Sequence, residues 1–362
     1  MKKIMVLCLI AGLTVGTAAC GKRDTGNQSE TNTAPVSETD TAAAGETSTG
    51  AEDETGLKPV RIGAVGQSNV LTEAAGIAQE NGYLEEELEK EGYTAEIVGF
   101  AQAGPAINEA FSAGEIDMAV YGDMPATIAK ASGVDTTIFA AENTECQMGI
   151  LVQNDSDITS ADDLKGHKVI VARGTIYHQY FKSLIADAGI GEDELEQINT
   201  FSDAASVMAG KEADALITSA SIAYYLEKKG IGKVIETTVD HPQWTSQFLA
   251  VSNTTFLKEN PNAAKAFIRA LLRAQAFAQE NPQEACEVIA KITEGYTADI
   301  YEKTYAYDTS FRYFSPEINE ENMEKLRVLE EFLENESLIA SPVDMDSFVD
   351  TSYYEEVIKE QG

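Results

Sequence analysis

Two successive series of short β-rich runs and amphipathic helices occupy the chain from Lys58 to Ser252. The first series starts with Val60–Val65 and ends with Thr137–Ala141, and the second starts with Gly149–Gln153 and ends with Phe248–Ser252. Strands separated by helices of this size indicate βαβ units, which build mostly parallel sheets. The pattern therefore predicts an α/β fold of two lobes, each a sheet flanked by helices, with the chain crossing between them twice.

A helical region is predicted after the last strand, and a final amphipathic helix is expected in the acidic tail that starts at Ser337. We place lobe 1 at residues 57–148 and 249–362, and lobe 2 at residues 149–248. The long C-terminal helices are expected at Asn262–Glu280, Pro282–Ile292, Ala298–Ala306 and Asn319–Glu334.

Residues 1–20 have the pattern of an export signal. Lys2 and Lys3 precede the apolar run Ile4–Val15, and small residues then lead to Cys20. About a dozen apolar residues are too few to span ~30 Å of hydrocarbon comfortably. The residues before Cys20 resemble the lipobox of bacterial lipoproteins, which implies acylation of the Cys20 thiol and attachment to the membrane. Ordinary cleavage that leaves Cys20 as an unused thiol is the alternative.

Residues 21–56 are rich in Thr, Ser, Glu, Ala and Gly and nearly free of large apolar side chains. Such a segment cannot bury enough surface to offset the entropy of ordering, so we expect a disordered tether. A flexible coil of this length reaches about 30–40 Å on average. The exported part would then lie on the outer face of the cytoplasmic membrane or in the periplasm.

The formal net charge of −34 argues against binding to nucleic acid or to anionic lipid headgroups. Beyond the signal, Cys146 and Cys286 are the only cysteines, and they could either pair in an exported protein or remain buried thiols. The three histidines lack the spacing of metal ligands. The sequence has no GxSxG, HExxH or P-loop motif. We therefore expect no metal and no cofactor.

Five motifs between Lys58 and Glu334 resemble, by their order and spacing, the sulfonate/nitrate/taurine branch of the type II periplasmic-binding-protein superfamily. The resemblance implies two α/β lobes that close on a ligand, with the first lobe built from both ends of the segment. It also implies a solute-binding component of an ABC importer, with a permease and its ATPase as partners. The motifs are Gly104–Asp117, Tyr121–Pro125, Ser160–Val169, Ala172–Thr175 and Gln247–Ser252.

Three loops between a predicted strand and a helix carry small or hydroxylated residues: 66–69, 121–125 and 173–178. Ligands of open α/β sheets lie at the carboxyl ends of strands, where helix N-termini offer unpaired N–H groups. By resemblance, these loops line the cleft of the family. The ligand-binding candidates are Gln67, Ser68, Asn69, Gly122, Asp123, Met124, Arg173, Gly174, Thr175, Tyr177, His178, Thr218, Ser219, Trp244 and Gln247.

Several of these candidates have structural alternatives. Ser68, Asn69 and Asp123 suit the N-cap position of a helix, where a side chain binds backbone N–H groups rather than a ligand. Tyr177 and His178 could stack on the solute or simply pack within their helix. Trp244 is the only tryptophan, and its ring could form a wall of the pocket.

The charges near the strand ends leave the solute open. Arg173 is the one cation near a helix start, and it could pair with a sulfonate or a carboxylate. Four acidic residues lie near the same strand ends, so zwitterionic and neutral heterocyclic solutes are alternatives to sulfonate, nitrate or taurine. They are Glu73, Asp123, Glu142 and Glu145.

The function we expect is capture of a small solute by a monomeric lipoprotein that is not an enzyme. One alternative is a sensor or partner-binding lipoprotein on the same fold. The other is an enzyme of the pyrimidine-precursor-synthase type, which would need a convergent nucleophile and base, and the sequence shows no such set.

Overall fold

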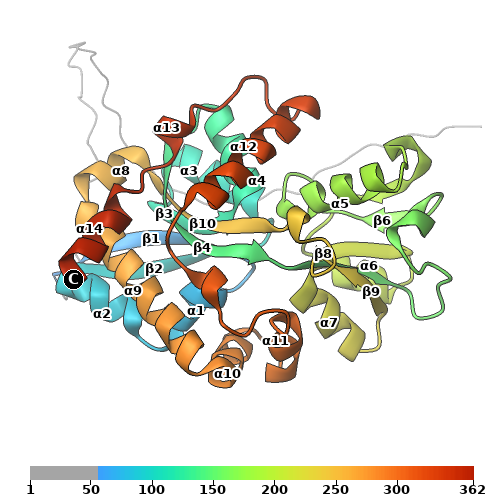
Figure 1. The fold of residues 1–362 in the computed structure, drawn as a ribbon, viewed down its shortest axis with the longest axis horizontal. Helices are drawn as coiled ribbons and strands as arrows, with labels where there is room; N and C mark the ends of the chain where they lie inside the picture. The colour runs from blue at the N-terminus through green and yellow to red at the C-terminus, as the bar shows by residue number, and fades with distance from the viewer. Residues whose placement is uncertain (1–55) are drawn as a thin grey trace, which may run out of the picture. The chain divides into compact units, whose positions relative to one another are not determined.

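The computed structural model describes residues 56–362, so the expected signal, Cys20 and nearly all of the expected tether lie outside the described residues. The described residues form two five-stranded sheets flanked by helices (Figure 1). Within this part of the chain, no helix combines the length and the apolarity needed to cross a membrane.

The first sheet has the strand order β2-β1-β3-β10-β4. Strand β1 is parallel to β2 and β3, whereas β10 is antiparallel to both of its neighbours, β3 and β4. Four of the five strands therefore run in one direction. The strands are β1 (Lys58–Val65), β2 (Tyr93–Phe100), β3 (Met118–Gly122), β4 (Thr136–Cys146) and β10 (Ser246–Asn253).

The second sheet has the order β7-β6-β8-β5-β9. Strand β6 is parallel to β7 and β8, and β5 is antiparallel to both β8 and β9, so again a single strand is reversed. The strands are β5 (Met148–Val152), β6 (Lys168–Ile170), β7 (Glu196–Ile198), β8 (Ala215–Ser219) and β9 (Lys233–Thr237).

The chain passes between the sheets twice. Gln147 alone separates β4 from β5, and the return segment from β9 to β10 contains a short 3-10 helix, η3 (Pro242–Trp244). The expected fold of two mostly parallel α/β sheets with a helical C-terminal region is confirmed. The expected lobe boundary at residues 248 and 249 falls inside β10, because Ser246 already pairs with Cys146 in the first sheet. The division of the chain into lobes stays a prediction.

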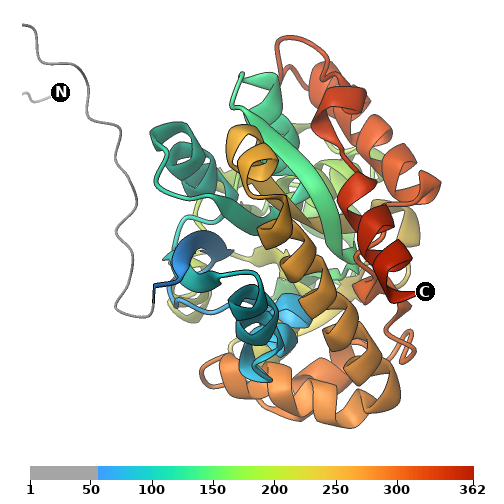
Figure 2. The ribbon, with the colours of Figure 1, turned by 90° about the vertical axis from the view of Figure 1, so that its left-hand side faces the viewer.

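Helices cover both faces of the first sheet. Helices α9 and α14 lie side by side on one face together with α1, α2 and α10 (Figure 2). The other face carries α3, α4, α12 and α13. The bounds are α1 (Glu73–Glu80), α2 (Tyr83–Lys90), α3 (Gly104–Ala113), α4 (Asp123–Ala131), α8 (Thr254–Glu259), α9 (Pro261–Glu280), α10 (Pro282–Ile292), α11 (Ala298–Thr304), α12 (Glu320–Asn335), α13 (Met345–Phe348) and α14 (Ser352–Gln361).

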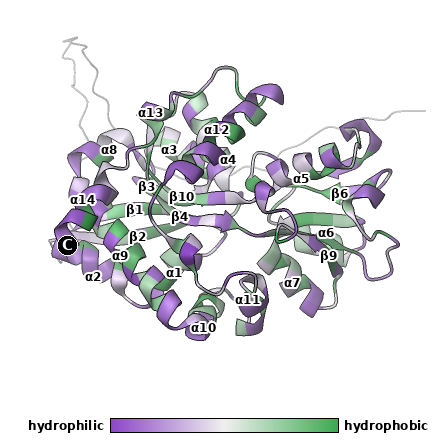
Figure 3. Ribbon diagram, viewed as in Figure 1, coloured by the Kyte–Doolittle hydropathy of each residue, from purple (hydrophilic) through white to green (hydrophobic). Residues whose placement is uncertain are grey.

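The second sheet shows the period-two burial expected of a strand with two covered faces. Ile150 and Val152 face α5 on one side, whereas Leu151 faces α6 and α7 on the other. Hydrophobic residues gather in the strands of both sheets, and α12 and α14 carry many hydrophilic residues (Figure 3). The helices are α5 (Ile176–Asp187), α6 (Ala204–Ala209) and α7 (Ala220–Lys228), with short 3-10 helices η1 (Ala161–Leu164) and η2 (Glu192–Glu194), and η4 (Arg312–Phe314) beside the first sheet.

Cys146 and Cys286 are both buried and free, so the structure answers the question that the sequence left open. They belong to separate parts of the core, since Cys146 packs with α5 and Cys286 packs with α9 and α10.

Candidate ligand-binding pocket

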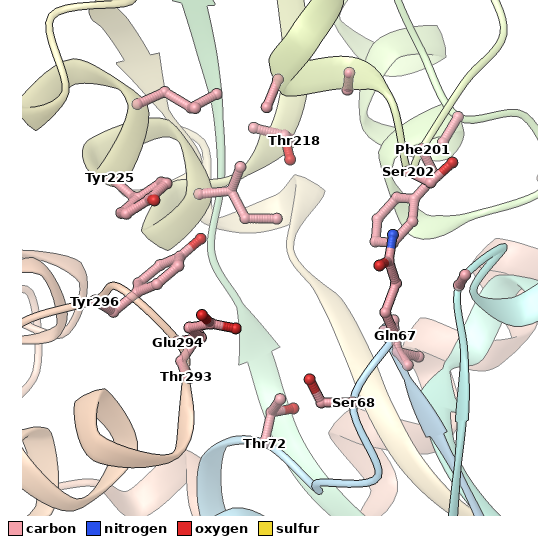
Figure 4. A pocket seen from close by; sticks show the side chains of 18 of the residues that line it. Gln67, Ser68, Thr72, Phe201, Ser202, Thr218, Tyr225, Thr293, Glu294 and Tyr296 are labelled. Atoms are coloured by element: carbon pink, nitrogen blue, oxygen red, sulfur yellow. The ribbon is translucent and has the colours of Figure 1, made fainter.

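A pocket of 430 Å³ lies between the two sheets, at the carboxyl ends of their parallel strands (Figure 4). The first sheet contributes the loop from Val65 to Thr72, which joins β1 to α1, and the second contributes the end of β8 and the loop from Thr200 to Ala205. The segment Ile292–Tyr296, between α10 and α11, supplies a further wall. This position agrees with the rule that ligands of open α/β sheets bind beyond the carboxyl ends of the strands.

Aromatic rings form two walls of the pocket. The rings of Tyr225 and Tyr296 stack with centroids 4.4 Å apart and an interplanar angle of 6°. The ring of Tyr177 lies nearly parallel to that of Phe201, at 6.0 Å and 10°. Figure 4 shows the Tyr225–Tyr296 pair on one side and Phe201 with Gln67 on the other. Such walls suit a flat solute, because aromatic rings bury large areas and stack at these spacings.

The polar side chains that line the pocket are mostly neutral. Ser68, Thr72, Ser202, Thr218 and Thr293 offer hydroxyl groups to a solute. Among the described lining residues, Glu294 is the only charged one, and its side chain is exposed at the end of α10. The pocket therefore combines stacking surfaces with hydroxyl donors and one carboxylate.

A buried carboxylate occupies the N-terminus of α1, next to the pocket residue Thr72. Oε1 of Glu142 accepts a hydrogen bond of 2.9 Å from the Ala75 N–H. Burial, and then the charge of Glu73, raise the pKa of Glu142 well above its ordinary value. Burial also raises the pKa of Glu73, although its hydrogen bond with Asn143 opposes the shift. The two carboxyls therefore hold protons more strongly than exposed ones.

Asp123 joins the start of α4 to the start of β10. Its Oδ1 accepts the N–H of Met124 at 2.8 Å, and its Oδ2 accepts the N–H of Gln247 at 3.0 Å. Burial raises the pKa of Asp123 to about 7, although these two hydrogen bonds favour the ionised form. The carboxyl group thus accepts one backbone N–H in the first turn of α4 and one at the start of β10.

The structure brings four of the expected site residues to the pocket: Gln67, Ser68, Tyr177 and Thr218. Gly122 and Thr175 line a narrow neighbouring hollow of 20 Å³, which shares Tyr177 with the pocket. Thr175 also caps α5, because its Oγ1 accepts the N–H of Tyr177 at 3.3 Å.

The other candidates on the first sheet lie away from the pocket. The Oδ1 atom of Asn69 accepts the N–H of Gly99 at 3.0 Å, so Asn69 holds its loop against β2. Met124 is fully buried and packs with the α5 core. Gln247 is also fully buried, and its side chain donates to the carbonyl of Asn322 at 3.2 Å.

The remaining candidates lie in the part of the chain that forms the second sheet and the return crossing, where most of them have partners within the protein. The exposed guanidinium of Arg173 donates to Gln197 at 3.1 Å, and Gly174 makes the turn before α5 with φ +74°. The ring of Trp244 stacks on His241 at 4.2 Å. His178 is buried in α5, which lowers the pKa of its imidazole. Ser219 caps α7 by accepting the N–H of Ile222 at 3.2 Å.

Sequence reasoning missed the aromatic residues Phe201, Tyr225 and Tyr296. Phe201 follows the end of β7. Because ligands of open α/β sheets bind beyond the carboxyl ends of strands, its position in the sequence could have identified it as a candidate. Tyr225 lies in α7, and the spacing of apolar residues along a helix does not distinguish a side chain that contacts a ligand from one that packs in the core. Tyr296 reaches the pocket because α11, which follows it, packs against α7.

Ion pairs join α7 to α11 beside the aromatic wall. Lys228 lies 2.7 Å from Asp299, and Lys303 lies 2.8 Å from Glu227. These side chains are largely exposed, so each pair contributes only about 0.2–1 kcal/mol. Together with the Tyr225–Tyr296 stack, they link α7 of the second sheet to the segment that follows α10.

Comparison with known proteins agrees with this architecture. A relative in Bacillus subtilis (strain 168), provisionally named an aliphatic sulfonates-binding protein, is 27% identical over 241 residues, which cover 66% of this chain and 70% of the relative. A solved structure from Methylobacillus flagellatus KT, provisionally named the periplasmic sulfonate-binding protein SsuA, is 26% identical with a TM-score of 0.69, covering 84% of this chain and 95% of that one.

An enzyme also shares the fold. The desulfurization enzyme DSZB is 15% identical with a TM-score of 0.66, covering 84% of this chain and 100% of the enzyme, a likeness that concerns the fold alone. The family model described as "NMT1/THI5 like" matches residues 72–285, more than half of the chain. The chain therefore belongs to the NMT1/THI5-like family.

Proposed function

We propose that this protein is the extracytoplasmic solute-binding component of an ABC importer, which captures a small organic molecule and delivers it to a permease and its ATPase. The observation that carries the proposal is the 430 Å³ pocket lined by residues of both sheets and of the helical region. Its volume lies within the range of about 300–1,000 Å³ that is typical of small-molecule sites. The names of the relatives from B. subtilis and M. flagellatus support the same role.

The proposed mechanism is closure of the two halves around the solute. The two crossings, at Gln147 and at residues 238–245, are the hinges, since few residues there need to change their backbone angles. Neither of the described cysteines lines the pocket, and both are buried. This favours a receptor over an enzyme that uses a thiol nucleophile.

The proposal predicts that solutes stabilise the native state. A thermal-shift screen of residues 56–362 would test sulfonates, nitrate, taurine, amino acids and heterocycles after unfolding and refolding to remove bound ligand. A solute that binds only the native state raises the melting temperature in a saturable manner. If no compound raises the melting temperature, the result favours the alternative function, a sensor that recognises a partner protein.

Replacing the aromatic wall tests whether the pocket is the site. Tyr225→Leu is expected to weaken binding of a solute from the screen by about three- to tenfold, because it removes a stacking surface. Tyr353→Leu is the matched control, since Tyr353 is a partly buried tyrosine on α14 that does not line the pocket. Equal affinities of the two variants in isothermal titration calorimetry would place the site elsewhere.

We further propose that the exported chain is anchored through lipidated Cys20 and residues 21–56. Cys20→Ser is expected to move the protein from the membrane fraction to the soluble fraction, because the lipidated cysteine is its only anchor in this proposal. Detergent phase partitioning of cell extracts measures the change. Wild-type protein that partitions into the aqueous phase would contradict lipidation.

A further inference from the structure

We infer that the pocket binds an organic cation with a flat ring, rather than a sulfonate or another anion. This inference rests on the proposed solute-binding function and assigns a chemical class to the solute. It is carried by the charges of the lining residues, by the way the chain uses its own helix N-termini, and by the aromatic walls.

No lysine, arginine or histidine occurs among the described residues that line the pocket. The cations nearby have partners of their own. Arg173 is turned toward Gln197, and Lys228 and Lys303 are paired with Asp299 and Glu227. An anion that left water for this pocket would therefore lose its hydration without gaining a counter-charge, which is costly.

Helix N-termini are the other common anion sites of such folds, because their first N–H groups lack partners within the helix. In four of the helices that start near the pocket, a side chain of the protein accepts a backbone N–H, whereas the six-residue helix α6, whose first residues Ala204 and Ala205 line the pocket, has no such cap. Glu142 accepts the N–H of Ala75 in α1. Asp123, Thr175 and Ser219 do the same in α4, α5 and α7. An anionic ligand at these four helix starts would compete with these side chains for N–H groups.

The features that remain in the pocket favour a cation. Glu294 provides a carboxylate beside Tyr296, as Figure 4 shows. The faces of the Tyr225, Tyr296 and Phe201 rings carry the negative part of the ring quadrupole and can attract positive charge where they are open to the solute. The formal net charge of −34 also raises the local concentration of cations around the protein.

The aromatic walls explain the preference for a flat ring. The Tyr225–Tyr296 pair and Phe201 stand on opposite sides of the pocket in Figure 4. A planar ring between them could stack on either wall, and the hydroxyl groups of Ser68 and Thr218 could accept hydrogen bonds from its nitrogen atoms.

The test compares probes that share a ring and differ in charge. Two series are titrated into residues 56–362 at pH 7.5: tryptamine, tryptophol and indole-3-propionate, then benzylamine, benzyl alcohol and phenylacetate. We expect the cation of a series to bind most tightly and the anion most weakly. If the anion binds as tightly as the cation, the inference is wrong while solute binding stands. If no member of either series binds but a panel solute that is not a flat-ring cation does, the assignment of a flat-ring cation is wrong.

Variants of Glu294 test whether its carboxylate causes the preference for a cationic solute. Glu294→Gln is expected to weaken binding of the cation by about threefold and to leave the neutral probe unchanged, because the exposed carboxylate contributes modestly. Glu294→Lys should weaken the cation further and strengthen the anion. Glu287→Gln is the matched control, an exposed glutamate of α10 outside the pocket. Equal cation affinity in Glu294→Gln and Glu287→Gln would overturn the role of Glu294. The proposed function fails only if no compound of any charge binds.

Discussion

Replacing Glu87 with alanine is expected to lower the free energy of unfolding by about 1.5–3 kcal/mol, because it removes a buried carboxylate that accepts hydrogen bonds from two arginines, which then keep only the more exposed partners Glu91 and Glu86. Glu87 is 6% exposed and joins α2 to α9. Its carboxylate accepts hydrogen bonds from Arg269 at 3.0 Å and from Arg273 at 2.9 Å, and it also pairs with Lys90 at 2.7 Å. Burial alone would raise the pKa of Glu87, but the bonds with Lys90 and Arg269 outweigh it and hold the pKa below its ordinary value.

Glu86 provides the matched control for this substitution. It precedes Glu87 in the same helix and pairs with Arg273 at 2.8 Å, but its side chain is 57% exposed. Glu86→Ala is therefore expected to cost less than about 1 kcal/mol. Urea denaturation of both variants measures the difference. Similar losses in the two variants would show that burial of the Glu87 network contributes little.

Replacing Glu142 with glutamine is expected to stabilise the protein by about 2 kcal/mol at pH 8, because the wild-type protein must bind a proton at this buried carboxyl when it folds, whereas glutamine is neutral in both states. Glu142 is fully buried, and its Oε2 has no hydrogen-bond partner among the described residues. The neighbouring Glu73 adds a like charge. Glutamine keeps an oxygen that can accept the N–H of Ala75.

The gain should depend on pH with a defined sign. Because the pKa of Glu142 is raised in the folded state, the native protein holds a proton that the unfolded chain has released above its ordinary carboxyl pKa. Wild-type stability therefore falls as the pH rises through this window, whereas glutamine does not titrate. The advantage of Glu142→Gln should shrink toward pH 4.5 in denaturation curves, with exposed Glu115→Gln as control. A gain that is independent of pH would contradict this account.

Hydrophobic patterning predicted most of the fold, and what it missed has physical causes. It predicted β5 and β10 but not their reversed direction, because the pattern of apolar residues in a buried strand is the same whether the strand is parallel or antiparallel to its neighbours. Strand β9 was missed because charged residues interrupt its short apolar run between Lys233 and Thr237. Helix α2 was missed although Leu84 and Leu88 have helical spacing, since its other residues are mostly charged.

The site was less predictable than the fold. The rule of strand ends found Ser68 and Thr218, which the structure brings to one pocket. It did not separate them from Asn69 and Ser219, because the same polar side chains serve ligands and backbone caps equally well. Tyr296 lies between α10 and α11, far in sequence from the strands that border the pocket, so only tertiary packing brings it there.

The wall formed by Ile292–Tyr296 has a consequence for the divergence of related receptors. This segment lies between two helices and outside both sheets, so its exposed side chains, such as Glu294, can change without disturbing strand register. A lineage could thus acquire a new solute by altering a few surface residues and keep its scaffold and hinges intact. The residues that recognise the solute can therefore change independently of those that maintain the fold.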